Sequence, residues 1–270
     1  MCSANHKGPL LNPGPMLAFD SYVGIDYSGQ KTAKDQLPGI QVVSARQGSD
    51  PIRLPPPSGA TNWSRQEVAE WLAATLRQSG RVIAGIDHAF SLPVRYLDHY
   101  RLDTWQSFLE HFCGMWRKEL AIAEQSQALA SIERLRQGGR GDWRLTEQWT
   151  SSAQSVLDVQ RPRSVAKASL AGIPWLFWIR RVAGEATHFW PFDGLTVLDD
   201  KSVIAEVYPS IFTRRYVDVP KKSHLSDAWA VCKWMQDRDS EGLLHPYLGL
   251  FLTSTERSVV AREGWILGVM

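Results

Sequence analysis

The chain has few cysteines, and none of them is placed for a disulfide framework or a zinc cluster. Only three occur in 270 residues: Cys2, Cys113 and Cys232. They are odd in number, lie far apart and form no CxxC pair, which excludes a disulfide scaffold and a cysteine zinc site. This cysteine usage is typical of a reducing compartment, and we expect a cytoplasmic protein. The seven histidines show no His-Glu-x-x-His spacing, so a zinc hydrolase of that type is not indicated either.

Long apolar runs and an excess of one charge are also missing. No run of 18 apolar residues occurs, so no membrane span is predicted. Residues 1–20 lack the apolar segment of a secretion signal, and we expect a flexible tail followed by a single domain over residues 21–270. Thirty Lys and Arg residues nearly balance 28 Asp and Glu residues, for a formal net charge of +2. Binding to nucleic acid would therefore depend on local basic patches.

Short apolar runs alternate with amphipathic segments, which is typical of α/β proteins. Residues 81–87 form an apolar run that ends in an acid, as in a strand buried on both faces. Ser64 and Glu67 have the spacing of a capping box and start a helix that we expect to end at Gly80. Further strands are predicted over residues 22–26, 40–45, 203–208 and 265–269, and further helices over residues 223–238 and 253–262. The fold class expected is a mixed sheet flanked by helices.

Two other stretches complete this outline. Three consecutive prolines at residues 55–57 predict a loop over residues 50–59. The middle of the chain, roughly residues 104–182, is predicted to be mainly helical, and we expect it to be a helical insertion within the domain.

Two aspartates end two of the apolar strands, each inside the tripeptide Gly-Ile-Asp. Asp26 and Asp87 would meet if their strands were parallel neighbours, because ligand sites of α/β sheets form at the carboxyl ends of strands. Two close carboxylates repel one another unless a cation lies between them, and Mg²⁺ or Mn²⁺ prefers such oxygen ligands. The alternative is that each Asp only forms an Asx turn at the end of its strand. The repeated tripeptide favours the metal site.

Two further acids are candidates for the same site. Glu206 lies inside an apolar strand, where an inward carboxylate is costly without a partner, although alternation could also point it to solvent. Asp227 falls in the first turn of a predicted helix, where an acid also has a simpler role in stabilising the helix dipole.

Five short motifs in sequence order resemble domain-of-unknown-function family 429, a group of RNase H-like predicted nucleases. They are residues 22–26, 84–87 with 91–93, 206–210, 226–230 and 263–266. The resemblance implies an RNase H-like fold in which Asp26, Asp87 and Asp227 bind a divalent metal and act in catalysis, with Glu206 as a fourth candidate. The sequence departs from the family pattern at His88, where a small residue followed by Pro is expected.

Candidate substrate contacts are basic residues near these motifs. One group lies between Glu206 and Asp227, and His88 is a further candidate for a phosphate contact, although a hydrogen-bonding role in its loop is favoured. A second group, which includes Arg144, surrounds the Gly138-Gly139 pair. Each group has the alternative of a solvated or salt-bridged surface. The first group consists of Arg214, Arg215, Lys221 and Lys222.

Together these features predict a divalent-metal phosphodiesterase that cleaves nucleic acid with carboxylate-held Mg²⁺ or Mn²⁺. An inert binding protein with the same fold is the main alternative. A phosphotransferase of the actin and sugar-kinase type is less favoured. Residues 24–30 resemble its first phosphate loop, but the further Gly-rich nucleotide loops are missing.

Overall fold

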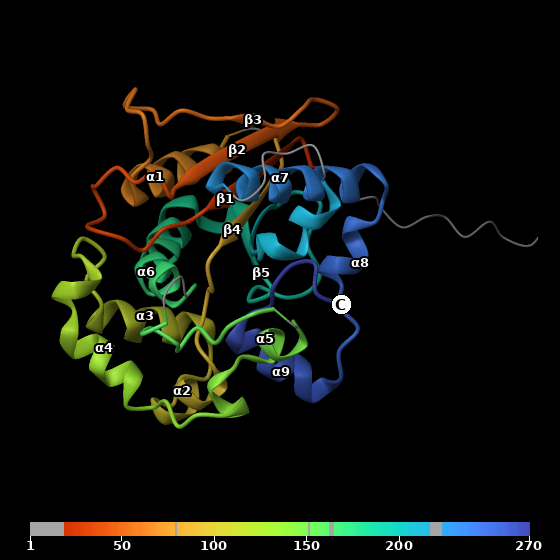
Figure 1. Ribbon diagram of the computed structural model, residues 1–270. Helices are drawn as coiled ribbons and strands as arrows, with labels where there is room; N and C mark the ends of the chain where they lie inside the picture. Colours follow the sequence, from red (N-terminus) through yellow and green to blue (C-terminus); the bar gives the residue numbers. More distant parts are fainter. Residues whose placement is uncertain (1–18, 79, 151, 162–164, 217–222) are drawn as a thin grey trace, which may run out of the picture.

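The computed structural model describes residues 19–78, 80–150, 152–161, 165–216 and 223–270 (Figure 1). These residues form a mixed sheet of six strands with helices on both faces, which confirms the predicted α/β class. The strands are β1 (Ser21–Asp26), β2 (Gln41–Arg46), β3 (Ile52–Arg53), β4 (Val82–Asp87), β5 (Thr187–Trp190) and β6 (Ser202–Glu206). Their order across the sheet is β3-β2-β1-β4-β6-β5. The first three strands pair antiparallel, whereas β1, β4, β6 and β5 run parallel.

Alternating side chains divide the sheet into two apolar cores. On β1, Val23 and Ile25 belong to the core on one face, and Tyr22 belongs to the core on the other. The helices α1 (Arg65–Leu76), α3 (Trp105–Met115) and α6 (Val165–Ala183) cover the first face, and α7 (His224–Ser240) and α8 (Leu244–Leu248) cover the second. The remaining α-helices are α2 (Val94–His99), α4 (Ser126–Glu133), α5 (Leu145–Trp149) and α9 (Ser254–Glu263).

Side-chain caps explain where three of these helices begin. The hydroxyl of Ser64 accepts from the backbone N–H of Glu67 and the Glu67 carboxylate accepts from the N–H of Ser64, as the capping-box spacing predicts. Ser223 and Thr253 cap α7 and α9 in the same way, so the predicted starts of both helices are confirmed. Helix α1 ends at Leu76, earlier than predicted, and Gly80 lies in the turn before β4 with a φ of 109°.

The structure corrects the prediction of a closing strand over residues 265–269. Only an isolated bridge between Ile266 and Glu206 is present there. Gly268 has a φ of 101°, and the Trp265 indole N–H donates to the Val269 carbonyl oxygen at 3.0 Å, so the chain curls back on itself. The short strands β3 and β5 were not predicted, and β3 lies within the stretch predicted to be a loop.

Residues 104–182 contain α3, α4, α5 and most of α6, as the predicted helical content requires. Helix α6 packs against α1 and α3 and adds Ala166, Leu170 and Ile173 to a core of the sheet. None of the helices in the described residues has the length and apolar character of a membrane span.

Candidate metal centre

Asp26 and Asp87 lie side by side at the carboxyl ends of two neighbouring parallel strands. The register of β1 and β4 pairs Asp26 with Asp87 directly, two residues beyond the pair Gly24 and Gly85. Asp26 is buried, and Asp87 is partly exposed to a cavity of about 620 Å³. The two carboxylates predicted from the repeated Gly-Ile-Asp are therefore neighbours.

The tripeptide itself explains why both acids face α7. Side chains alternate along a strand, so the Gly and the Asp of each tripeptide share one face and the Ile takes the other. Ile25 and Ile86 belong to the core under α1 and α6. A Cβ atom on Gly24 would lie 2.0 Å from the Ala228 carbonyl oxygen, so only glycine lets α7 approach β1 this closely. This close approach brings the residue before Ala228, Asp227, towards Asp26.

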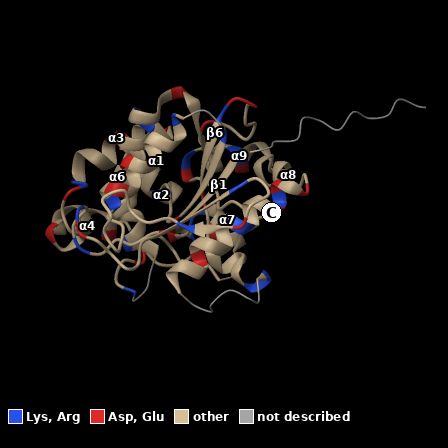
Figure 2. Ribbon diagram, turned by 90° about the horizontal axis from the view of Figure 1, so that it is seen from above, with Lys and Arg blue, Asp and Glu red and all other residues tan. Residues whose placement is uncertain are grey.

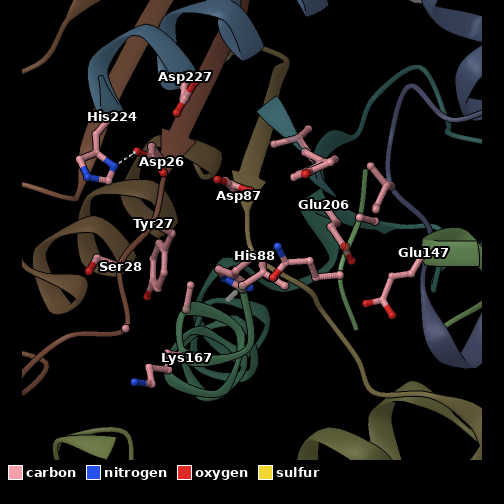
Figure 3. A pocket seen from close by; sticks show the side chains of 18 of the residues that line it. Asp26, Tyr27, Ser28, Asp87, His88, Glu147, Lys167, Glu206, His224 and Asp227 are labelled. Carbon is pink, nitrogen blue, oxygen red and sulfur yellow. Dashed lines mark hydrogen bonds and ion pairs between the residues drawn. The ribbon is translucent and has the colours of Figure 1, made fainter. Parts of the chain in front are cut away.

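The first turn of α7 supplies two groups to the centre. Asp227 lines the cavity, and Figure 3 shows its side chain beside Asp26 and above Asp87. His224, three residues earlier, has its ring Nδ1 at 2.5 Å from Asp26 Oδ2, although its side chain is 62% exposed. The sequence analysis missed His224. The signal was available, because residues three apart in the first turn of a helix share a face.

Burial opposes the ionisation of all three aspartates, and neighbouring acidic charges oppose it further at Asp87 and Asp227. Burial raises the pKa of Asp87 well above its usual range, and the charges of Asp26 and Asp227 raise it further. Burial and then Asp26 raise the pKa of Asp227 to about 6, against the opposing effect of His224. Burial also raises the pKa of Asp26, while the His224 hydrogen bond lowers it and in turn raises the pKa of His224. The centre therefore resists carrying three negative charges unless a cation compensates them.

Glu206 lies across the cavity from this group, because the register of β6 puts it out of phase with the aspartates. Its partner on β4 is Ile86, not Asp87. Figure 3 shows Glu206 on the side of the cavity that also carries Glu147, away from Asp26 and Asp227. Glu206, at the end of β6, therefore lines the same cavity as the aspartates but does not join them.

A buried arginine donates hydrogen bonds to both carboxylate oxygens of Glu206. Arg144 donates to Glu206 Oε1 at 2.5 Å and to Oε2 at 2.7 Å, and its Nε donates to Glu147 at 2.9 Å. The Phe90 backbone N–H also donates to Glu206 Oε2. Arg144 is 1% exposed, so it is a buried ion-pair partner and not the surface phosphate contact considered from the sequence. Metal binding by Glu206 stays a prediction that would require this pair to open.

The loop after β1 forms another wall of the cavity, and Arg65 holds its shape. The guanidinium of Arg65 donates to the carbonyl oxygens of Ser28, Gln30 and Lys31 at 3.1, 2.6 and 3.0 Å. Gly29 packs so tightly on α6 that a Cβ there would lie 2.0 Å from the Lys167 carbonyl oxygen. The loop is therefore fixed between α1 and α6.

His88 is a buried, neutral loop residue. Its Nδ1 lies 2.9 Å from the Ala89 carbonyl oxygen, and its ring packs between Tyr27 and Phe90. Burial lowers the pKa of His88 to about 4, so the ring carries no charge at neutral pH. This environment matches the hydrogen-bonding role favoured from the sequence.

The predicted basic group is only partly described. Arg214 lines a second hollow beside the centre, together with His224 and Asp227. Arg215 follows it in the short 3-10 helix Thr213–Arg215 and does not line this hollow. Lys221 and Lys222 lie outside the described residues.

The aspartates suit a hard divalent cation by chemistry, although they do not form a complete ligand shell. Among the described residues, no group of three or more His, Cys, Asp or Glu side chains is close enough to enclose a metal ion. The in-register carboxylates of Asp26 and Asp87, with Asp227 beside them, offer the oxygen donors that Mg²⁺ and Mn²⁺ prefer, and these ions usually keep several water ligands. The residues present therefore fit a water-rich magnesium or manganese site.

Comparison of the chain with protein-family models, with curated proteins and with solved structures finds no match. The resemblance based on five short motifs thus stays a prediction.

Proposed function

We propose that this protein is a divalent-metal-dependent phosphodiesterase that cleaves nucleic acid, built on an RNase H-like fold. The observation that carries the proposal is the meeting of Asp26 and Asp87, in register on β1 and β4, with Asp227 on α7. An acid on the first strand, one on a later strand and one on a late helix are the positions that the RNase H-like resemblance assigns to metal binding. The mixed sheet with helices on both faces supports the same proposal.

A bound cation would stabilise the ionised form of these carboxylates, which burial and neighbouring charge disfavour. Each of the three has a raised pKa, and burial is the largest cause in every case. Asp26, Asp87 and Asp227 would hold Mg²⁺ or Mn²⁺, which supplies an activated water and stabilises charge on the scissile phosphate.

His224 has a separate role at the mouth of the site. Its hydrogen bond orients the Asp26 carboxylate, and its exposed ring can hold a proton that offsets the negative charge. Arg144 acts on the opposite wall, where it keeps the Glu206 carboxylate paired and out of the aspartate group.

Local basic residues favour a phosphate-bearing substrate. Arg214 lies in the hollow that adjoins Asp227, and Lys167 lines the main cavity from the first turn of α6. Lysine and arginine at such positions neutralise phosphates without any overall positive charge on the protein.

The test is a cleavage assay with labelled single-stranded and duplex DNA and RNA, a hybrid and a branched junction, each with Mn²⁺, Mg²⁺ or chelator. We expect metal-dependent cleavage by the parent protein and only background cleavage by Asp87→Asn. Asp199→Asn is the matched control, since Asp199 is exposed and distant from the cavity lining.

Two results would contradict the proposal. Cleavage that persists in Asp87→Asn would place the chemistry elsewhere. If no substrate is cleaved and calorimetry detects no binding of Mn²⁺, the inert binding protein becomes the better description.

A further inference from the structure

A second cavity, remote from the aspartates, lies between the end of α3 and the C-terminal half of α6. Its volume is about 610 Å³. Trp116, Phe177 and Trp178 supply aromatic surface, and Arg117, Lys118 and Arg181 supply positive charge. None of these residues lines the aspartate cavity.

The aromatic side chains are partly open to a ligand. Trp116 is buried and stacks on Phe112 with 5.6 Å between ring centroids, so it forms a fixed wall. Phe177 and Trp178 are each partly exposed on adjacent positions of α6. A planar ring entering the cavity can therefore stack on aromatic surface that the protein core has left uncovered.

The positive charges exceed the acids available to pair with them. Lys118 pairs with Glu119 at 2.6 Å. Among the described residues the guanidinium groups of Arg117 and Arg181 form no ion pair, and both side chains are exposed. The charge of Arg117 also acts on Glu119, the one acid that lines this cavity among the described residues. Arg181 instead lies over the Phe177 ring, 5.8 Å from its centroid. Two arginines beside open aromatic rings match a ligand that combines a planar base with a phosphate.

We propose that this α3–α6 cavity binds a nucleotide unit, with the base stacked on Phe177 or Trp178 and the phosphate held by Arg117 and Arg181. The inference rests on the proposed function only in naming a nucleic acid strand as the source of that unit. Helix α6 links the cavities, since Lys167 lines the first and Trp178 the second. Eleven residues of helix separate these two side chains, which is about 16 Å along the axis. A short single strand is long enough to occupy both sites.

Binding is measured by fluorescence anisotropy of a labelled 12-nucleotide single strand. All proteins carry Asp87→Asn and are kept in chelator, so that the strand stays intact and binding is measured without metal. The double variant Arg117→Gln/Arg181→Gln should bind roughly 10-fold more weakly. The plot of log affinity against log salt should become less steep by about 0.7, the value expected when one phosphate of a single strand is no longer neutralised. Arg46→Gln, at an exposed arginine of β2 outside both cavities, is the matched control and should bind like the parent.

Stacking is tested separately by substitution of the indole. Trp178→Ala should weaken binding roughly 10-fold, and Trp178→Phe should restore most of the affinity because the phenyl ring still stacks. Adenosine monophosphate and inorganic phosphate are titrated as competitors. Tighter binding of the strand than of the mononucleotide assigns the cavity to nucleic acid, and equal affinity assigns it to a free nucleotide.

The outcomes separate this inference from the proposed function. Parent-like affinity and salt dependence in the arginine and Trp178→Ala variants would overturn the inference and leave the aspartate centre untouched. Loss of binding in these variants supports it even if the cleavage assay finds no nuclease activity.

Discussion

At the scale of single residues, the acids in the cavity differ in how their charge is compensated. Glu206 is fully buried and has a guanidinium on both oxygens. Asp26 has His224, whose charge depends on pH. Among the described residues Asp87 and Asp227 form no salt bridge, and the pKa of each is raised by burial first and then by acidic neighbours. Asp87 and Asp227, the two carboxylates of this group without a cationic partner, thus both line the cavity.

Asp227→Asn should stabilise the metal-free protein at neutral pH. The pKa of Asp227 is about 6 when folded and 3.8 ordinarily, so the folded state binds the proton more tightly. The stability that this proton contributes is fully present below pH 3.8 and is lost as the pH rises to about 6. Since the carboxyl is partly exposed, we expect a gain of about 1 kcal/mol in the variant above pH 6. Urea denaturation in chelator at pH 4 and pH 7.5 measures the difference in unfolding free energy between the variant and the parent.

The gain in unfolding free energy should be largely lost at pH 4, because Asp227 of the folded parent protein is then protonated and as neutral as asparagine. Asp199→Asn serves as the control at both pH values. An equal or lower stability of Asp227→Asn at pH 7.5 would show that burial and the charge of Asp26 do not destabilise the ionised Asp227 carboxyl.

Arg144→Met should destabilise the fold by about 3–5 kcal/mol, because it leaves the buried Glu206 and Glu147 carboxylates without their partner. The double variant Arg144→Met/Glu206→Gln should recover part of this loss, since one unpaired charge is removed with the arginine. Chemical denaturation of both variants and of Glu206→Gln alone gives the coupling energy. Additive effects of the two substitutions would contradict the ion pair.

At the scale of elements, the centre depends on how closely α7 approaches the sheet. Helix α7 packs on β1 and β2, and Gly24 lies directly under the Ala228 carbonyl. Gly85 on β4 is similarly enclosed by Val207 and Val231. Two glycines of the repeated tripeptide thus make room for the helix that carries Asp227. Site geometry and helix packing are set by the same short motif.

Gly24→Ala should cost more than about 2 kcal/mol of stability, because the new Cβ would meet backbone that cannot move without shifting α7. It should also weaken Mn²⁺ binding, since the shift carries Asp227 away from Asp26. Gly114→Ala is the matched control. A Cβ at Gly114 in α3 meets nothing within 4 Å, so alanine there should be neutral or stabilising. Denaturation and calorimetry measure both effects, and unchanged metal affinity in folded Gly24→Ala would refute the link.

At the scale of the whole molecule, charge is spread and function depends on local sites. Figure 2 shows Lys and Arg interspersed with Asp and Glu over many elements, in keeping with the net charge of +2. The aspartate centre and the α3–α6 cavity have opposite character, one acidic and one basic with aromatic rings. Helix α6 borders both cavities, so a single ligand lying along this helix would contact both, as the two proposals require.

Divalent cations should raise the thermal stability of the parent protein. A ligand that binds only the folded state stabilises it by about 2.7 kcal/mol at 100 times its dissociation constant. Thermal unfolding with increasing Mn²⁺ measures this at pH 7.5. The effect should shrink at pH 5, because protons compete for carboxylates whose pKa values are raised. The same increase in Asp87→Asn as in the parent would mean that Mn²⁺ stabilises the protein somewhere else.

Local sequence patterns predicted the α/β class, the starts of three helices and, given parallel neighbouring strands, the meeting of Asp26 with Asp87. These depend on local patterns: apolar runs, capping spacing and a repeated tripeptide at strand ends. Strands β3 and β5 escaped prediction because two and four residues are too few to show alternation.

Which acids share a face depends on how distant segments of the chain pair and pack. Whether Glu206 joins Asp87 depends on the register between β4 and β6, which shifts it by one residue and so to the opposite face. Its partner Arg144 is 62 residues away in sequence, and His224 is 198 residues from Asp26. Such contacts arise from the packing of distant segments. Helical spacing places His224 on the face of Asp227, but no local pattern pairs it with Asp26 or pairs Arg144 with Glu206.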